Sequence, residues 1–150
     1  MDNKTPEERS LNMSKIHSTN TGPEIIVRKI LFALGYRFRL QRKDLPGKPD
    51  VVMPGRKIVI FVHGCFWHSH QGCKNSNLPK SNQDFWKKKL QGNVQRDLKV
   101  KDELLEQGWR VLWVWECATR KKANLSQLAT ELRLWIESTD CFGEIPANFQ

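Results

Sequence analysis

Residues 50–63, DVVMPGRKIVIFVH, hold two apolar segments joined by a Pro-Gly turn, and this stretch predicts the centre of the fold. Segments 50–53 and 57–62 are typical of two paired strands, because Pro54 and Gly55 favour a hairpin turn. The second segment is apolar at successive positions, which indicates a central strand covered on both faces. We therefore expect a sheet with helices on each side.

Two helix starts precede this hairpin. Thr5-Pro6-Glu7-Glu8 predicts a short helix toward Lys15, and Thr21-Gly22-Pro23-Glu24 predicts a second helix that ends at Gly35. Glu24 then lies in the first turn of the second helix. Residues 36–40 alternate between apolar and polar side chains, which indicates a half-buried strand.

The C-terminal half of the chain predicts two more helices and one more strand. Residues 81–84 begin a long helix that ends at Gly108, with these residues on its apolar side: Trp86, Leu90, Val94, Leu98 and Leu105. A strand follows over 109–115 and a helix over 126–137, and no element is expected after Ser138. This order predicts an α/β fold, a three-layer α/β/α arrangement with a central mixed sheet.

The composition points to nucleic acid as the partner. The 150 residues include 25 Lys and Arg against 16 Asp and Glu, a net charge of +9, and the sequence pI is about 9.6. Such a balance suits a protein that neutralises phosphates, although a basic solvated surface would also account for the charge alone. The longest apolar run, 58–62, is too short to span a bilayer, and the charged N-terminus lacks a secretory signal. We expect a cytoplasmic protein without a membrane partner.

Segment 63–73, HGCFWHSHQGC, brings possible metal ligands together. Three of the four ligands that a closed structural zinc site needs fall in this loop: Cys65, His70 and Cys73. Cys117 is the favoured fourth ligand because it follows a strand at the same edge of the sheet, with Cys141 as the alternative. His68 is as close in sequence as His70, so the spacing leaves that choice open.

A second kind of cation site is expected at the end of the hairpin. Strand pairing brings Asp50 close to the exit of the second strand, around Val62 and His63, where a carboxylate meets a freed backbone carbonyl. Such hard oxygen ligands suit Mg²⁺. The simpler interpretation is that Asp50 only ends a turn. His63 and His68 are free for proton transfer if zinc takes the other ligands of the loop.

Two large aromatic side chains, Phe66 and Trp67, lie between the possible zinc ligands. We expect them to be exposed, because the flanking cysteines and histidines leave little room to bury both rings. Exposed apolar wedges insert between base pairs and bend the duplex. Burial beside the metal is the alternative, and Trp86 also fits the buried side of its own helix.

Six ordered motifs between residues 9 and 136 carry a family resemblance. They are Arg9-Ser10-x-Asn12-Met13-Ser14-x-Ile16, Thr21-x-Pro23-Glu24, Leu45-Pro46-Gly47-Lys48-Pro49-Asp50, His63-Gly64-Cys65-Phe66-Trp67-His68, Asn93-Val94-Gln95-Arg96-Asp97, and Gly108-Trp109-Arg110-Val111 with Trp115-Glu116-Cys117. In residue type and spacing they resemble the very short patch repair endonucleases. The resemblance implies a restriction-endonuclease-like fold and a nick in duplex DNA 5′ to the thymine of a T·G mismatch, the lesion left when 5-methylcytosine deaminates.

The resemblance also implies which residues hold the metals. Asp50 binds the catalytic Mg²⁺ together with the main-chain carbonyl of Val62, and Glu24 holds metal-bound water. The implied ligands of structural zinc are Cys65, His70, Cys73 and Cys117. This set selects His70 over His68 and Cys117 over Cys141.

The same resemblance implies the residues that act on DNA. His63, oriented by Asp97, and His68 act around the scissile phosphate, with His68 as the candidate for activating or positioning water. The residues implied to intercalate at the mismatch are Phe66, Trp67 and Trp86. The division of labour between the two histidines stays open.

The expected organisation is one endonuclease domain over 1–150, with a DNA-clamping arm (1–20), a catalytic core (21–137) and a tail (138–150). The expected partners are double-stranded DNA with a T·G mismatch and, functionally, a cognate cytosine-5 methyltransferase. We expect a monomer.

Two features depart from the family pattern. Val62 stands where some members have threonine, and Gln71-Gly72 makes the loop before Cys73 one residue longer. Two other functions remain as alternatives. One is a restriction-type nuclease of the same fold with another sequence specificity, and the other is a zinc-containing DNA-binding module without catalysis.

Overall fold

The computed structural model describes residues 21–73 and 76–146, and within them the chain forms one mixed five-stranded sheet. The strands follow one another in space in the order of the sequence: β1 (Arg39–Leu40), β2 (Val51–Met53), β3 (Ile58–His63), β4 (Arg110–Trp115) and β5 (Phe142–Ile145). Strands β1 to β3 are antiparallel neighbours, whereas β3, β4 and β5 run parallel. The predicted mixed sheet is therefore confirmed. The predicted helix from Thr5 toward Lys15 lies outside the described residues.

Helix α2 (Gly22–Ala33) begins and ends where its capping residues predict. The Thr21 hydroxyl accepts a hydrogen bond from the backbone N–H of Glu24 at 3.4 Å, as an N-cap does. At the other end Gly35 takes φ +91°, and the N–H of Tyr36 bonds to the carbonyl of Leu31 at 3.1 Å. This is the Schellman ending that requires a left-handed residue, usually glycine.

The central hairpin also forms as predicted, with a 3₁₀ turn in place of a tight two-residue turn. The turn η1 (Pro54–Arg56) joins β2 to β3, and the register pairs Val51 with Ile60 and Met53 with Ile58. The expected strand over 36–40 is reduced to the two residues of β1. In this register the partner of Arg37 would be Pro54, where β2 has already turned away, so pairing stops.

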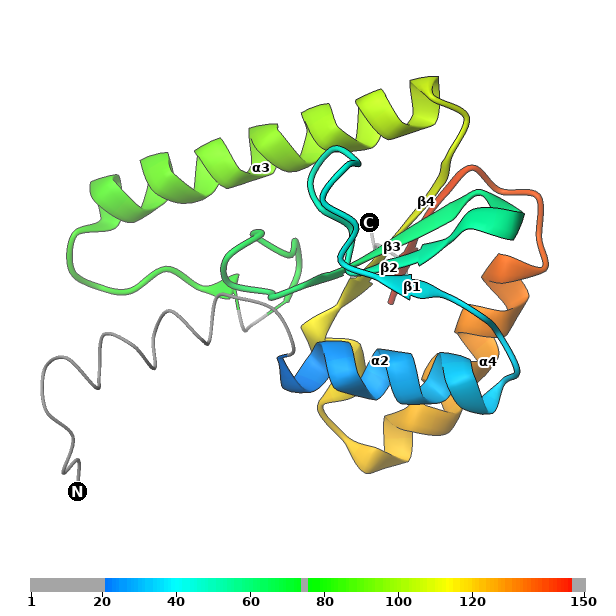
Figure 1. Cartoon of the computed structure of the whole chain (residues 1–150). Coiled ribbons are helices and arrows are strands. Elements are labelled where there is room, and N and C mark those ends of the chain that lie inside the picture. The colour runs from blue at the N-terminus through cyan, green and yellow to red at the C-terminus, as the bar shows by residue number, and fades with distance from the viewer. Residues whose placement is uncertain (1–20, 74–75, 147–150) are drawn as a thin grey trace, which may run out of the picture.

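Helices cover both faces of the sheet (Figure 1). On one face α2 and α4 (Leu125–Ile136) form a core with alternate strand residues; its fully buried members include Val27, Leu31, Ile60, Leu112, Leu128 and Leu132. On the other face α3 (Gln83–Glu106) covers a smaller core, formed by Val52, Val59, Phe61, Leu104, Trp109 and Val111. Among the described residues, no helix combines the length and apolar composition needed to cross a bilayer.

The predicted apolar side of α3 is wrong in part. Only Leu90 and Leu104 are buried on this helix, and Leu98 is 37% exposed. The helix is longer than the sheet face beneath it, so its C-terminal turns contact the strands and its N-terminal half reaches over the loop that follows β3 (Figure 1). A helical period alone does not show where the supporting sheet ends.

The prediction of no element after Ser138 is also wrong. Strand β5 pairs with β4 in parallel, Val111 with Phe142 and Val114 with Ile145. Gly143 allows a close approach, because a Cβ there would lie 2.3 Å from Nε1 of Trp135 on α4. The segment FGEI carries a glycine and a glutamate and has no clear alternation, so its strand character depends on the neighbouring strand and helix.

Candidate active site and metal centre

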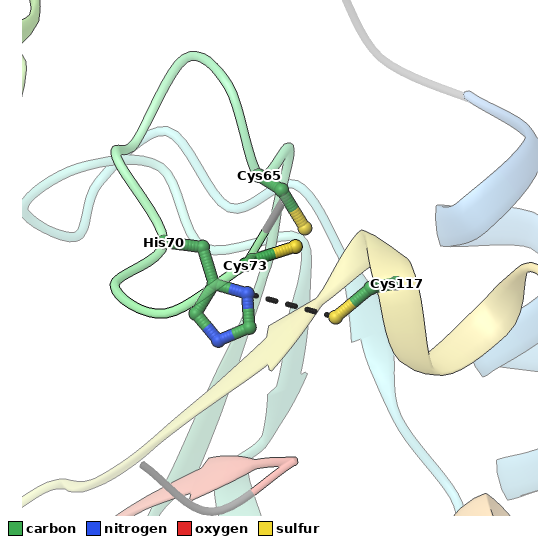
Figure 2. Close-up of side chains that lie close together, drawn as sticks. All are labelled: Cys65, His70, Cys73 and Cys117. Atoms are coloured by element: carbon green, nitrogen blue, oxygen red, sulfur yellow. Dashed lines mark hydrogen bonds between the residues drawn. The ribbon is translucent and has the colours of Figure 1, made fainter. Parts of the chain in front are cut away.

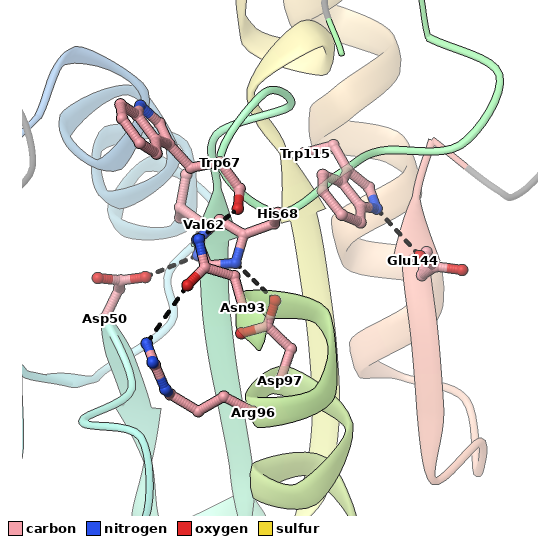
Figure 3. Close-up of polar contacts among 9 residues, drawn as sticks. All are labelled: Asp50, Val62, Trp67, His68, Asn93, Arg96, Asp97, Trp115 and Glu144. Atoms are coloured by element: carbon pink, nitrogen blue, oxygen red, sulfur yellow. Dashed lines mark hydrogen bonds and ion pairs between the residues drawn. The ribbon is translucent and has the colours of Figure 1, made fainter. Parts of the chain in front are cut away.

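Asp50 lies directly before β2, beside the end of β3. Its Oδ2 accepts a hydrogen bond from the backbone N–H of Val62 at 2.7 Å (Figure 3). The loop that leads to Asp50 is held against α3 at Gly47, which has φ +72° and where a Cβ would lie 2.5 Å from Val100 Cγ1. Strand pairing and this close contact together fix the position of the carboxylate.

A cleft of about 490 Å³ opens at this end of β3. It is lined by all the residues expected to bind Mg²⁺ or act in catalysis, namely Glu24, Asp50, Val62, His63, His68 and Asp97. These residues come from α2, the start of β2, the end of β3, the following loop and α3. Two basic side chains that the sequence analysis did not single out, Lys48 and Arg96, also line the cleft. Lys48 lies between two prolines in the approach to Asp50, a position that could have drawn attention to it.

Two carboxyl groups, those of Asp50 and Glu24, form the acidic side of this cleft. Burial raises the pKa of Asp50 to about 7, the Val62 amide opposes this rise, and the neighbouring Glu24 adds to it. Glu24 is 5% exposed and accepts a hydrogen bond from Arg28 Nη2 at 3.1 Å. A buried and a partly buried carboxyl group this close favour a divalent cation, because a cation stabilises the ionised form of both. The donor set thus fits Mg²⁺.

The two histidines on the other side of the cleft stack on each other. The rings of His63 and His68 lie 4.0 Å apart between centroids and are nearly parallel, at 7°. Asp97 Oδ2 lies 2.6 Å from His68 Nδ1 (Figure 3). The expectation that Asp97 orients His63 does not match this contact, because the loop after β3 places His68 between His63 and α3.

The two histidines have different surroundings. His63 is 4% exposed, and burial, followed by the nearby His68, holds its pKa well below the usual range. Its Nδ1 is buried and has no hydrogen-bond partner within the described part of the chain. The His68 side chain is 29% exposed and has a carboxylate partner. A neutral, buried imidazole and a partly exposed imidazole paired with a carboxylate are both suited to proton transfer.

The four expected zinc ligands converge in a second cluster on the far side of the same loop (Figure 2). Its donor atoms lie within 4.8 Å of one another, and they belong to Cys65, His70, Cys73 and Cys117. Cys117 Sγ and His70 Nδ1 are 3.6 Å apart. Tetrahedral bonds of the length found at zinc would place a sulfur and a nitrogen about 3.6 Å apart. The group can therefore hold a metal ion.

The sequence left two choices open for this cluster, Cys117 or Cys141 and His70 or His68. The places of these side chains in the structure decide both. Cys117 lies on η3 (Glu116–Thr119), which directly follows β4, whereas Cys141 is exposed and outside the cluster. His68 pairs with Asp97 and is not part of it. Burial raises the pKa of the Cys65 and Cys117 thiols and lowers the pKa of His70. A bound cation reverses the effect on the thiols, because thiolates are the metal ligands.

The aromatic residues expected to intercalate form one cluster where the loop meets α3. Phe66 and Trp67 have ring centroids 5.1 Å apart, and Trp86 of α3 lies 5.4 Å from Phe66 and 6.0 Å from Trp67. All three are partly buried against one another, which is intermediate between the exposed and the buried expectation. Asn93 Nδ2 donates to the carbonyl of Trp67 at 3.0 Å and ties the loop to α3 (Figure 3).

One exposed ring beside this cluster was missed. Phe85 is 59% exposed and contacts Trp86 with centroids 5.3 Å apart. The Lys89 ammonium lies 5.9 Å from the Trp67 ring and 6.0 Å from the Phe85 ring. The feature of the sequence that could have revealed this ring is the Phe-Trp pair at 85–86, which three lysines follow. Cations above aromatic rings at a surface suit a contact with nucleic acid.

Comparison with known proteins shows the family of this chain. The family model for DNA mismatch endonuclease Vsr matches residues 1–75. The Type II nicking enzyme V.XorIIP of Xanthomonas oryzae is 48% identical over 132 residues, 88% of this chain and 94% of that protein. The Type II nicking enzyme V.NmeAIP of Neisseria meningitidis is 45% identical, over 86% and 94% respectively, and DNA mismatch endonuclease Vsr of Escherichia coli is 43% identical, over 85% and 83%. The chain belongs to the Vsr family and is a DNA endonuclease.

Proposed function

We propose that this endonuclease nicks duplex DNA 5′ to the thymine of T·G mismatches that arise from deamination of 5-methylcytosine, with Mg²⁺ in the cleft and zinc in the cysteine-histidine cluster. The observation that carries the proposal is the cleft beside β3, where Asp50 and Glu24 face a histidine pair. Membership of the Vsr family supports the DNA substrate, and the Escherichia coli relative is itself named a mismatch endonuclease.

The acidic side of the cleft holds the cation. Asp50 and the carbonyl of Val62 would hold Mg²⁺, and Glu24 would hold water beside it. The substitution of valine for threonine at position 62 has little effect on a ligand that belongs to the backbone. Bound Mg²⁺ supplies positive charge that offsets the charge developing on the phosphate. Arg96 and Lys48 line the same cleft and add positive charge at its entrance.

The histidine side of the cleft moves protons. His68, paired with Asp97 at 2.6 Å, accepts a proton from the water that attacks phosphorus, and the carboxylate stabilises the imidazolium that forms. The bond from phosphorus to the leaving sugar oxygen breaks, and this oxygen takes a proton from solvent water. His63 lies behind it in ring contact, and its buried Nδ1, which has no hydrogen-bond partner among the described residues, is left to bind a water.

The remaining parts of the loop hold and open the duplex. Zinc bound by the cluster fixes both ends of the segment between Cys65 and Cys73. The aromatic cluster of Phe66, Trp67 and Trp86 inserts at the mismatch, where weak pairing lowers the cost of unstacking. The partial burial of these rings leaves part of each ring exposed for this contact.

The proposed architecture is restriction-endonuclease-like. The mixed sheet, with the cleft at the end of its central strands, supports it. We further propose that the protein is cytoplasmic, acts as a monomer through a single domain with a DNA-clamping arm at 1–20, and serves beside a cytosine-5 methyltransferase.

The test is a single-turnover nicking assay on a T·G duplex and on the matched T·A duplex, with Mg²⁺ and with EDTA. We expect one nick, 5′ to the mismatched thymine, only in the T·G duplex and only with Mg²⁺. Equal cutting of the matched duplex would overturn the repair function. Cutting in EDTA would overturn the metal mechanism.

A restriction-linked specificity is the second candidate, because two of the relatives are named Type II nicking enzymes. It predicts that nicking depends more on the bases flanking the T·G pair than on the mismatch itself. A set of T·G duplexes with varied flanks, assayed beside matched duplexes of the same sequence, separates the two functions.

A further inference from the structure

Two side chains outside the proposed ligand set lie behind His70. The Trp115 ring, 4% exposed at the end of β4, stacks on the His70 imidazole with centroids 4.2 Å apart and planes at 8°. Its Nε1 donates a hydrogen bond to Glu144 Oε1 at 3.0 Å (Figure 3). Glu144 belongs to β5, the strand that the sequence did not predict.

Strand pairing explains why these side chains meet. In the parallel register Glu144 lies opposite Trp113, so Glu144, Trp113 and Trp115 point to the same face of the sheet. Trp115 is then the diagonal neighbour of Glu144, within reach of a long side chain. The contact therefore depends on β5 being in register with β4.

The orientation of the His70 ring decides whether it can bind a metal. Its Nδ1 faces Cys117 Sγ at 3.6 Å, and in Figure 2 the other ring nitrogen points away from the three sulfurs. A nitrogen lone pair lies in the ring plane, so rotation of the imidazole turns it away from the cluster centre. The flat Trp115 ring against one face of the imidazole opposes that rotation.

We propose that Glu144 and Trp115 are positioning residues for the metal centre: the carboxylate holds the indole, and the indole holds the imidazole with Nδ1 toward the three thiols. This inference rests on the proposed metal at the cluster. Histidine ligands are commonly oriented by a hydrogen bond to their second nitrogen. Here the stacked Trp115 ring, held by the Glu144 carboxylate, orients the histidine instead. Because Glu144 lies on β5, this strand becomes part of the metal centre.

The test measures how fast the zinc-loaded, full-length protein gives up its metal to the coloured chelator 4-(2-pyridylazo)resorcinol. Glu144→Ala removes the acceptor, Trp115→Phe keeps a stacking ring without the N–H, and Glu144→Gln keeps an oxygen that can accept. The control is Glu131→Ala, which removes a carboxylate that accepts a side-chain hydrogen bond from Gln127 on α4. We expect release about 10- to 100-fold faster for Glu144→Ala and Trp115→Phe, and near the wild-type rate for Glu144→Gln and the control.

The possible results distinguish a wrong positioning role from a wrong metal centre. A wild-type protein that binds zinc, with Glu144→Ala and Trp115→Phe releasing it at the wild-type rate, overturns the positioning role alone. Glu144→Gln releasing zinc as fast as Glu144→Ala overturns the role of the hydrogen bond. A wild-type protein that binds no metal overturns both the proposed centre and the inference. Glu144→Gln keeps the shape of the glutamate and Trp115→Phe keeps an aromatic ring, and Trp115→Phe tests the positioning role independently of Glu144→Ala, so the result does not depend on Glu144→Ala folding.

Discussion

The two candidate cation sites on either side of the loop after β3 differ in how the chain builds them. The cysteine-histidine cluster takes three of its four donors from nine consecutive positions, Cys65 to Cys73, and it is closed by one residue after β4. The cleft takes its oxygen donors from α2, the residue before β2, and β3, and it stays open to solvent. A closed set of three sulfur donors and one nitrogen donor is typical of a structural metal, whereas a few hard donors in an open cleft leave room for water and substrate.

From this comparison we expect that a substitution at one of the two sites leaves the other site intact. The largest effect is expected from Asp50→Asn, which keeps the side-chain shape and removes its charge. Losing several kcal/mol of charge stabilisation should slow nicking by at least about 10³-fold, while zinc content and thermal stability stay unchanged. Single-turnover nicking and metal analysis of the same sample measure both. Loss of zinc from this variant would show that the two sites are one unit.

Cys117→Ser tests the cysteine-histidine cluster. It removes the ligand that closes the cluster, so the protein should lose its metal, and its melting temperature should fall by about 10 °C or more. The matched control is Cys141→Ser, at an exposed thiol outside the cluster, which should behave as the wild type. A Cys117→Ser protein that melts at the wild-type temperature would argue against a structural metal.

Asp97→Asn tests the histidine side of the cleft. The amide keeps the shape near His68 Nδ1 but no longer stabilises an imidazolium, so kcat should fall by about 10²-fold with little change in KM or melting temperature. Asp102→Asn, at an exposed position on the same helix, is the control. If kcat is unchanged in Asp97→Asn, the contact with His68 is structural only.

The smallest expected effect concerns the aromatic cluster. Phe66→Ala or Trp67→Ala should weaken binding to a T·G duplex by about 10-fold, since a stacked base contributes about 1–3 kcal/mol, and should affect a matched duplex less. Phe32→Ala, at a 77% exposed ring on α2, should leave both unchanged. Binding titrations with labelled duplexes measure this. An equal loss on both duplexes would remove the role in mismatch recognition.

Short-range patterns predicted the parts of the fold whose causes are local. The caps at Thr21 and Gly35, the hairpin from β2 to β3 and the spacing of Cys65, His70 and Cys73 each involve residues within about a dozen positions. The prediction that Asp50 lies near Val62 follows from hairpin register alone, and the 2.7 Å contact bears it out. In each case chain connectivity leaves few other geometries.

Long-range contacts account for the errors. Asp97 was paired with His63, but the loop inserts His68 between them, and no spacing reveals the path of that loop. The buried side of α3 was misplaced at Leu98 because the helix extends past the sheet. Both outcomes depend on where α3 crosses the sheet, which is decided by contacts such as Gly47 against Val100.

The sequence by itself determined the local elements, the candidate ligands and the chemistry those ligands suit, because periodicity, capping and donor type act over short separations. Only the tertiary structure decided which histidine pairs with Asp97, that Cys117 and not Cys141 completes the cluster, and that residues 142–145 form a strand that carries Glu144 to Trp115. These pairings join residues about 30 to 50 positions apart, and the side-chain contacts that select them exist only once the sheet and its helices have come together.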